Sequence, residues 1–325
     1  WYTTLGIPAV SDRVAQAVVK LTLEPLVEGI FHKDSYGYRP NKSAIQAIEV
    51  TRSRCWEYSW VLEFDIKGLF DNIRHDLLMK AVKKHTECKW VLLYIERWLK
   101  APFQKADGTR IERERGTPQG GVISPLLSNL FMHYVFDQWM TKQYPENPFC
   151  RYADDGIVHC KTEEDAVKLR EQLKGRFEEC GLEMHPEKTK IVYCKDDNRR
   201  GEYPNVQFDF LGYTFRPRRT RSRQGQNFTG FTPAVSDASA KAMRVKIQGW
   251  KIHLKSSSSI EALSKLYDGS IRGWMNYFGS FCKTGMYPTL RYMNGRLVKW
   301  AMRKFKRFKR RSKQAENWLG KIAKK

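Results

Sequence analysis

The sequence predicts an α+β fold, a βαββαβ sheet followed by an α-helical region. Two strand-like segments, at 61–64 and 189–194, flank an apolar hairpin at 149–160, and helical patterns separate them. The composition then changes, because residues 216–223 contain five Arg and the basic chain beyond about 238 has helical periodicity. Hydrophobic residues make up 41% and aromatics 13%, which indicates a packed globular core.

The net charge and the cysteine content limit the kinds of partner and of site that the sequence is compatible with. The 325-residue chain has a net charge of +23, which favours a polyanionic partner, nucleic acid before an anionic membrane. No apolar run approaches the roughly 18 residues of a membrane span, so we expect no membrane partner. The seven cysteines are scattered without a Cys-x-x-Cys pair, which argues against a zinc site or disulfide framework and favours a reducing cytoplasm.

A helix is predicted after Ser11, and Pro25 is expected to break or kink it. Its apolar face is expected to hold Val14, Ala17, Val18 and Leu21. The loop 35–43 that follows interleaves tyrosines with Arg39 and Lys42 and leads into a helix to about Arg54. Such a loop is equally typical of an ordinary turn and of a surface that stacks on bases and grips phosphates.

The segment Val61–Phe64 is predicted to be a buried strand, with Asp65 at its carboxyl end. A carboxylate at such a strand end is a candidate ligand, and its alternative is a capping or turn residue. Helices are expected at about 75–85 and 89–100, followed by two short strands around an Asp107-Gly108 turn.

A glycine-rich loop at 115–125 precedes the next helix, with Ser124 as its expected N-cap and Pro125 in its first turn. Such a loop lets a substrate backbone approach closely. It is not a Walker loop, because no Gly-Lys-Ser or Gly-Lys-Thr follows.

Two adjacent carboxylates, Asp154 and Asp155, lie in the predicted hairpin, where Asp155-Gly156 between apolar runs is a turn signal. The ordinary alternative is a solvated Asp-Asp-Gly turn. Between buried strands, however, two like charges repel each other and lose solvation unless a cation shares them.

The helix predicted at 163–180 and the strand at 189–194 complete the βαββαβ order, with helices expected on one face of the sheet. In this order the first strand neighbours the hairpin, so Asp65 meets Asp154 in space. Three carboxylates there suit two Mg²⁺ ions that stabilise phosphoryl transfer, and the basic surface suits a nucleic-acid backbone.

The C-terminal third is predicted to begin with a tight aromatic hairpin at 207–215, then a linker or long loop at 216–240. From residue 299 onward, 12 Lys or Arg stand against one acid. A solvated or frayed terminus is one interpretation. Aromatic residues among the charges favour the other, a helix that faces RNA or DNA.

A family resemblance extends over nearly the whole chain. Its motifs are, in order, Leu5–Pro8 with Asp12-Arg13, Ser35–Pro40, Phe64–Ile66 with Phe70-Asp71, Thr117–Gly120, Tyr152–Asp155, Gly181-Leu182 with Lys188-Thr189, Phe210–Tyr213 and Gly273–Phe278. In this combination the chain resembles the reverse transcriptases encoded by bacterial group II introns, also called maturases.

The resemblance implies a right-hand polymerase with a helical thumb. Residues 1–60 would be the fingers, shortened at the N-terminus because the family usually has some tens of residues before Leu5. Residues 61–225 would be the palm with an inserted fingers segment, and 226–325 the thumb or maturase domain. The DNA-binding and nuclease domains of some relatives would be absent.

The resemblance also assigns residue roles. The catalytic, metal-binding carboxylates would be Asp65, Asp154 and Asp155, the last a less direct ligand, and Ile66 would lend a main-chain carbonyl. Phe70 would be the gate against a ribose 2′-hydroxyl, with Gln119 and Arg13 contacting the nucleotide. Lys188, or alternatively Lys190, would donate a proton to pyrophosphate. The primer grip would comprise Phe210, Leu211, Gly212 and Tyr213. Nucleic-acid contacts are expected at Arg39, Lys42, Arg218, Arg219, Arg303, Lys304, Arg307 and Arg310.

The implied function is RNA-directed DNA synthesis from dNTPs on a DNA primer or target, with two Mg²⁺ ions or Mn²⁺ in their place. Group II intron RNA would be the template, and its binding would assist splicing and retrohoming. The alternatives are a splicing-only maturase and a cellular reverse transcriptase for defence or diversification, the latter disfavoured by Gly273–Phe278. The sequence leaves open whether the chain is a monomer or a homodimer.

Overall fold

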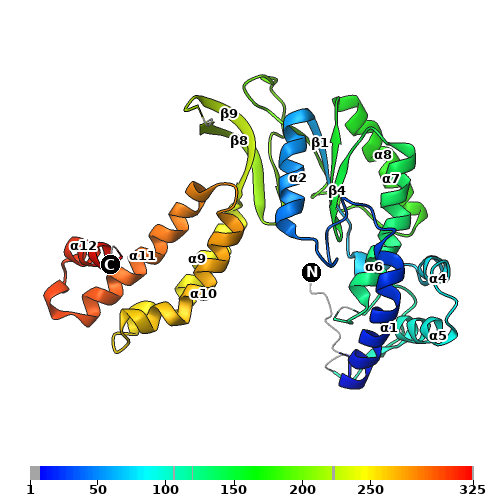
Figure 1. Ribbon diagram of the computed structural model, residues 1–325, viewed down its shortest axis with the longest axis horizontal. Helices are drawn as coiled ribbons and strands as arrows, with labels where there is room; N and C mark the ends of the chain where they lie inside the picture. Colours follow the sequence, from blue (N-terminus) through cyan, green and yellow to red (C-terminus); the bar gives the residue numbers. More distant parts are fainter. Residues whose placement is uncertain (1–7, 105–106, 119, 222–223, 324–325) are drawn as a thin grey trace. The chain divides into compact units, whose positions relative to one another are not determined.

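The computed structural model describes residues 8–104, 107–118, 120–221 and 224–323 (Figure 1). The chain forms two compact units. The first comprises the chain up to Phe208 together with Arg221–Gly230, and the second comprises Asp209–Thr220 together with the chain from Phe231 onward.

The first unit is built on a four-stranded antiparallel sheet ordered β4-β5-β1-β6. Its strands are β1 (Trp60–Asp65), β4 (Phe149–Tyr152), β5 (Asp155–Cys160) and β6 (Lys190–Tyr193). β1 lies at the centre and pairs with β5 on one side and β6 on the other. This arrangement confirms the predicted βαββαβ order, with the first strand beside the hairpin.

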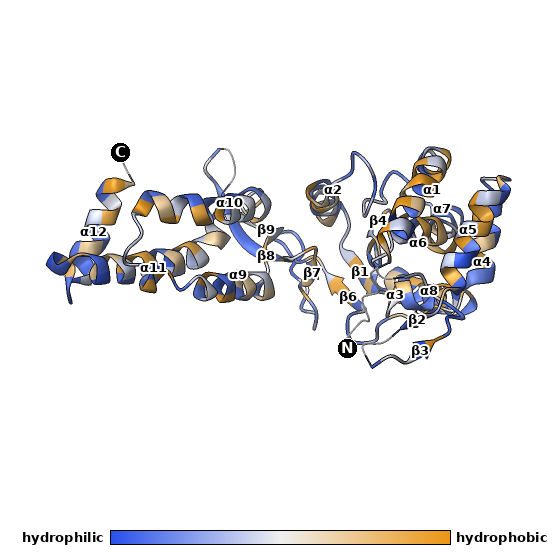
Figure 2. Cartoon of the chain, turned by 90° about the horizontal axis from the view of Figure 1, so that it is seen from below, coloured by the Kyte–Doolittle hydropathy of each residue, from blue (hydrophilic) through white to orange (hydrophobic). Residues whose placement is uncertain are grey.

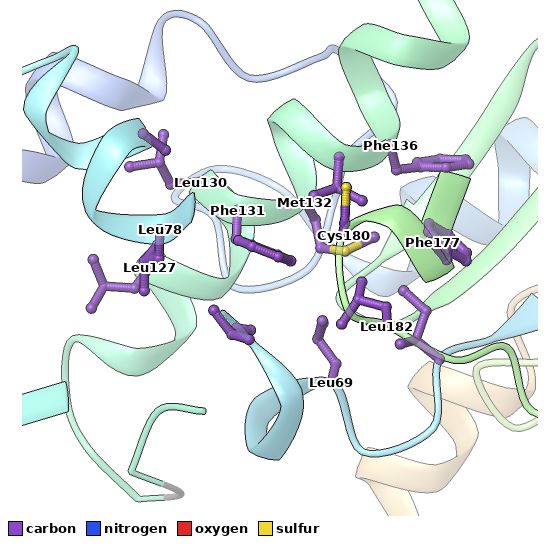
Figure 3. Packing of buried hydrophobic residues seen from close by; sticks show 14 of the residues in the cluster. Leu69, Leu78, Leu127, Leu130, Phe131, Met132, Phe136, Phe177, Cys180 and Leu182 are labelled. Carbon is purple, nitrogen blue, oxygen red and sulfur yellow. The ribbon is translucent and has the colours of Figure 1, made fainter. Parts of the chain in front are cut away.

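Helices precede, separate and follow these strands. They are α1 (Val10–Glu28), α2 (Ala44–Glu57), α3 (Leu69–Asn72), α4 (His75–Lys83), α5 (Lys89–Lys100), α6 (Ser124–Met132), the π-helical turn η1 (His133–Asp137), α7 (Gln138–Gln143) and α8 (Glu163–Glu179). A small hairpin of β2 (Phe103–Gln104) and β3 (Arg110–Ile111) follows α5, as predicted. The main core of the unit includes buried residues of α1, α5 and β1, and Figure 3 shows the part of it in which side chains of α3, α4, α6 and α8 point toward one another.

Helices cover both faces of the sheet, not one face as the sequence predicted. α8 contributes Phe177 to the main core, where its ring lies 5.6 Å from the ring of Phe64. α2 lies on the other side of the strands (Figure 1), where Cys150 Sγ contacts the carbonyl oxygen of Ala47 at 3.6 Å. Adjacent strand residues are therefore buried on opposite faces, as are Val61 and Leu62.

Helix α1 corrects another prediction. Its buried positions are Gln16, Val19, Leu23 and Val27. The predicted apolar positions Val14, Val18 and Leu21 are instead 60%, 49% and 71% exposed. The helix also continues through Pro25 to its end at Glu28. The sequence carries two apolar stripes at helical spacing, so periodicity alone could not tell which stripe packs inward.

The segment that was predicted to be a linker or long loop largely forms strands, and the helices of the second unit follow them. The strands β7 (Phe208–Phe210), β8 (Tyr213–Arg221) and β9 (Asn227–Val235) form a sheet in that order. The helices are α9 (Asp237–Gly249), α10 (Ile260–Phe278), α11 (Tyr287–Lys304) and α12 (Ser312–Ile322). The arginines of 216–221 lie within β8, so here a basic segment is part of a hairpin.

The basic C-terminal segment belongs to the core of the second unit. Trp300 and Ala315 are fully buried, and the ring of Trp318 lies 4.9 Å from that of Phe305. Figure 2 shows hydrophilic and hydrophobic positions along these helices, as expected for helices that pack on one face. This packing contradicts the interpretation of residues 299–322 as a frayed terminus.

None of the helices in the described residues combines the length and apolar character that a membrane crossing requires. All seven cysteines are free thiols, five of them buried. Burial raises the pKa of the Cys150 and Cys160 thiols to about 12, so these two are protonated at neutral pH and pack as small apolar side chains.

Gly156 and Gly175 offer a matched test of packing. A Cβ at Gly156 would lie 2.1 Å from Cζ of Phe64, whereas a Cβ at Gly175 in α8 would meet nothing within 4 Å. We expect Gly156→Ala to lower the free energy of unfolding by about 1–3 kcal/mol. Gly175→Ala should raise it by about 0.5–1 kcal/mol. Urea unfolding followed by circular dichroism measures both, and a Gly156→Ala variant as stable as the parent contradicts the packing described.

Candidate active site

The turn between β4 and β5 consists of Ala153 and Asp154. The predicted hairpin is present, but the predicted turn residues Asp155 and Gly156 both lie within β5. Ala153 adopts a φ of 58°, a region that favours glycine. Gly156 serves a different purpose, since only a residue without a side chain fits against the ring of Phe64.

Strand pairing brings three carboxylates to one end of the sheet. Asp65 is the last residue of β1 and lies directly opposite Asp155, the first residue of β5. Asp154 immediately precedes Asp155 in the turn. Asp65 is buried and the other two are half-buried. The sequence pattern therefore placed these side chains in the correct neighbourhood.

The charges of this cluster oppose one another. Burial, followed by the negative charges of Asp154 and Asp65, raises the pKa of Asp155 to about 7. Burial also raises the pKa of Asp154, with the charge of Asp65 adding to it. Neighbouring negative charge thus makes Asp154 and Asp155 harder to ionise, and a cation placed among the carboxylates would relieve this effect.

Lys188 supplies a positive charge to the cluster. Its ammonium group contacts Oδ2 of Asp65, and this hydrogen bond is the main reason why the pKa of Lys188 is raised. The segment that carries Lys188 is attached to the end of β1, where the amide of His185 donates to the carbonyl of Asp65 at 2.8 Å. Lys190, the alternative candidate, is exposed at the start of β6 opposite Glu63.

The main chain of Ile66 is oriented by its bridge to Met184. The hydrogen bonds of this bridge run from Lys67 N to Glu183 O, and from His185 N to Asp65 O. Neither bond uses the carbonyl oxygen of Ile66. The buried Ile66 side chain packs in the main core and fixes this stretch of backbone next to Asp65.

The donor chemistry of the cluster fits a hard divalent cation, which prefers carboxylate and carbonyl oxygens. In the described residues, no three His, Cys, Asp or Glu side chains are grouped closely enough to hold a metal ion as they stand. The ammonium of Lys188 is bound to Asp65 instead. The cluster therefore has suitable donors and an excess of negative charge, with one carboxylate engaged by lysine.

Aromatic side chains lie beside the carboxylates. Phe70 on α3 makes an edge-to-face contact with Tyr38 at 6.4 Å between ring centroids, and Tyr38 lies at the same distance from Tyr152. Tyr38 is 52% exposed and has a φ of 57°. Partial burial, followed by the charge of Asp154, raises the pKa of its hydroxyl. The sequence pointed to this loop, but not to Tyr38 as a neighbour of Phe70.

The glycine-rich loop is attached to the helix that carries Phe70. The amide of Thr117 donates to the carbonyl of Phe70 at 2.6 Å, and that of Gly116 donates to Ile73 at 2.7 Å. A Cβ at Gly116 would collide with this helix backbone, at 2.7 Å from the carbonyl oxygen of Phe70. Gln119 lies outside the described residues. Arg13 is exposed in the first turns of α1.

The predicted primer-grip segment, 210–213, is a tight turn within the second unit. Leu211 and Gly212 both have positive φ values. The hydroxyl of Tyr277 donates to the carbonyl of Leu211 at 2.8 Å, and the Tyr213 hydroxyl donates in turn to the carbonyl of Tyr277. Two widely separated motifs of the sequence, 210–213 and 273–278, are thus attached to each other.

The basic residues proposed to contact nucleic acid fall into two groups. The guanidinium of Arg39 binds Glu28 and the carbonyls of His32 and Ser35, and that of Arg218 donates to Thr232 and Thr214. Internal contacts also engage Lys42, Arg303, Lys304 and Arg307. Arg219 and Arg310 are exposed, and so are Arg303 and Arg307 despite their internal contacts. Internal engagement favours a structural role for the half-buried Arg39 and Arg218.

Comparison with known proteins gives the family. The model of the family "Reverse transcriptase (RNA-dependent DNA polymerase)" matches residues 1–215. The chain belongs to the reverse transcriptase family. The model of the "Group II intron, maturase-specific domain" matches residues 240–318. The chain is therefore a group II intron type of reverse transcriptase, in a family that uses divalent metal ions and RNA templates.

Relatives support this placement. Protein YkfC of Escherichia coli K12 is 32% identical over 288 residues, which cover 77% of this chain and 72% of YkfC. The group II intron-encoded protein LtrA of Lactococcus lactis is 27% identical over 85% of this chain, but the match spans only 58% of LtrA. A structure of apo telomerase from Candida tropicalis shares the fold at 14% identity, with a TM-score of 0.50 over 90% of this chain and 55% of that one.

Proposed function

We propose that this reverse transcriptase extends a DNA primer on group II intron RNA, and that its helical unit binds the intron RNA to assist splicing and retrohoming. The observation that carries the proposal is the meeting of Asp65, Asp154 and Asp155 at one end of the sheet. The raised pKa values of Asp154 and Asp155 mark a centre that gains from a bound cation.

The proposed domains are fingers at 1–60, palm at 61–225 and thumb at 226–325. Three boundaries between residues 208 and 240 support a division between palm and thumb in this part of the chain. The main segment of the first compact unit ends at Phe208, with Arg221–Gly230 returning to that unit. The reverse transcriptase family model ends at 215, and the maturase model starts at 240.

We assign Asp65, Asp154 and the Ile66 carbonyl as ligands of Mg²⁺, or of Mn²⁺ in its place, with Asp155 as a less direct contributor. When bound, two such ions stabilise the attacking 3′-hydroxyl and the leaving pyrophosphate. The chain's own contribution is to hold the carboxylates together at the sheet end, although their repulsion opposes this. Binding of metal would require Asp65 to exchange its Lys188 partner for the ion.

Lys188 is the preferred proton donor to pyrophosphate because it already lies at the carboxylate cluster, whereas Lys190 is paired in register with Glu63. Its raised pKa keeps it protonated at neutral pH, as a donor must be. Release from Asp65 would free the ammonium group to reach the leaving group.

The nucleotide pocket is proposed to lie between Phe70, Tyr38 and the loop that starts at Thr117. Phe70 would exclude a ribose 2′-hydroxyl, and Tyr38 would support its ring from the side. The expected substrates are dNTPs, with a DNA primer or target. The cytoplasmic location and the oligomeric state stay predictions.

A splicing-only maturase is the second candidate. The maturase-specific match over 240–318 favours an RNA-binding role, and that role does not require polymerisation. The same match disfavours a reverse transcriptase of defence or diversification systems. Because the carboxylates are all present, the two roles coexist in the proposal.

Asp154→Asn tests the polymerase assignment. The neutral amide removes a charge that a cation needs, so primer extension on an RNA template should fall at least 100-fold, while RNA affinity is retained. Gel-resolved extension and filter binding measure the two properties. Asp165→Asn, an exposed Asp at the start of α8, is the matched control and should extend normally. Primer extension by Asp154→Asn at the parent rate would contradict the assignment of Asp154 to the polymerase centre.

Phe70→Ala tests the gate. Without the ring, the pocket should accept a 2′-hydroxyl, so the ratio of ribonucleotide to deoxyribonucleotide kcat/KM should rise at least tenfold. Tyr94→Ala on α5 removes an aromatic ring elsewhere and should leave the ratio unchanged. Equal discrimination by Phe70→Ala and the parent would remove Phe70 from this role.

The RNA-binding role of the tail is testable without disturbing its core. Truncation at 299 would remove the buried Trp300, so charge removal at exposed positions is the better change. Replacing Lys309, Arg310 and Lys313 by Gln should flatten the slope of log affinity against log salt by about 0.7 for each lost phosphate contact on single-stranded RNA.

The control for this experiment removes the same charge from the first unit. Lys161, Lys168 and Lys174 are exposed on and beside α8, and their replacement by Gln should leave the slope unchanged. Equal slopes for the tail variant and the parent would place the RNA contacts elsewhere.

A further inference from the structure

Among the described residues, one arginine lies completely buried next to the turn of Ala153 and Asp154, here named the carboxylate turn. Arg151 is in β4, two residues before Ala153, and its partner Asp137 ends the π-helical turn η1. Neither side chain has any exposed surface. Burial of an ion pair is costly unless hydrogen bonds satisfy both groups, so the surroundings of Arg151 need an explanation.

Every N–H of the guanidinium has an acceptor. Nε and one Nη2 hydrogen bind the two Asp137 oxygens, each at 2.7 Å. Nη1 donates to Asn129 Oδ1 at 3.2 Å and to the carbonyl of Ala153 at 3.1 Å, and Nη2 also donates to Ser35 Oγ at 2.8 Å. An arginine has five such donors, and here all five are used.

The acceptors come from four separate segments of the first unit. Ser35 lies in the loop 35–43, here named the tyrosine-rich loop. Asn129 lies in α6, Asp137 in η1 and Ala153 in the carboxylate turn. Further bonds connect the same segments, since Asn129 Nδ2 donates to the carbonyl of Gly37 at 2.7 Å. The tyrosine-rich loop also pairs with the backbone of Arg151.

The turn that Arg151 holds is strained and closely packed. Ala153 has a φ of 58°, in the left-handed region that is unfavourable for a residue with a side chain. A Cβ at Gly37 would lie 2.6 Å from the amide nitrogen of Ala153, so the tyrosine-rich loop presses directly on the turn. A strained turn keeps such a geometry only if its surroundings fix it, and the bond to the Ala153 carbonyl does so.

We infer that Arg151, anchored by Asp137, is a positioning residue that fixes Asp154 for catalysis; this inference rests on the proposed polymerase function. Its bond to the Ala153 carbonyl orients the peptide that leads into Asp154. Its bonds to Ser35 and Asn129 hold the loop of Tyr38 against the same turn. No charge transfer or direct substrate contact is assigned to it.

The test separates positioning from folding. Arg151→Met alone would leave Asp137 buried without a partner and destabilise the fold, whereas an apolar pair can replace a buried ion pair without loss of stability. The double variant Arg151→Met/Asp137→Leu should therefore stay folded. Its kcat for primer extension should fall at least tenfold, while the KM for dNTP and the template affinity stay within twofold of the parent.

Rescue distinguishes positioning from packing. Glycine adopts the φ of residue 153 without strain, so adding Ala153→Gly to the double variant should restore kcat severalfold. Arg151→Lys, which keeps the charge but not the five-donor fork, should show a smaller loss of kcat than the double variant. A double variant with parental kcat, or a loss that Ala153→Gly leaves untouched, overturns the inference while the polymerase assignment stands.

Hydrogen exchange tests the same claim without activity. Exchange of the amides in 152–155 should rise at least tenfold in the double variant, and exchange in the second unit should not change. If the parent fails to extend primers, the polymerase assignment fails, and the exchange result still decides whether Arg151 holds the turn. Unchanged exchange in 152–155 contradicts the inference.

Discussion

Repulsion among three carboxylates is the constraint on which the first unit depends. The register of β1 with β5 sets Asp65 opposite Asp155, and the turn adds Asp154. Burial and the neighbouring charges raise the pKa of Asp155 to about 7, so the arrangement is unfavourable by itself. A sheet that served stability alone would gain nothing from it. The arrangement becomes favourable when a bound cation neutralises the carboxylates and binds a polyanionic substrate. This is the chemistry of the reverse transcriptase family.

The surrounding structure counters this repulsion with close packing. Phe64 leaves room only for glycine at position 156, which locks β5 against β1. The buried guanidinium of Arg151 donates hydrogen bonds to the carboxylate turn, to the tyrosine-rich loop and to α6, the helix that follows the glycine-rich loop. The carboxylates, Phe70 and Tyr38 thus belong to one connected framework. In the second unit, the turn at Leu211 is fixed separately to the aromatic face of α10.

Much of this framework could be predicted from the sequence. The order of strands and helices gave the βαββαβ sheet, because alternation and helical periodicity are local patterns, and the neighbourhood of Asp65 and Asp154 followed from that order. The predicted turn at Asp155 and Gly156 was wrong. The positive φ of Ala153 is held by a bond from Arg151, whose guanidinium is itself fixed by distant segments, and by the packing of Gly37, and no local pattern reveals these contacts. The prediction of the inward face of α1 was wrong because the helix has two apolar stripes. The hairpin of β8 and β9 was predicted to be a linker because its arginines resemble those of a linker. Long-range hydrogen bonds, such as those of Arg39, leave no pattern in the sequence.

Localised cleavage by iron can locate the cation directly. Fe²⁺ that replaces Mg²⁺ generates hydroxyl radicals with ascorbate and peroxide, and these cut the backbone near the metal. The assignment predicts cuts close to residues 65 and 154 in the parent chain, suppressed by excess Mg²⁺ and lost in Asp154→Asn. Cleavage confined to other segments, or cuts at these positions that persist unchanged in Asp154→Asn, would contradict a metal-dependent centre at the carboxylate cluster.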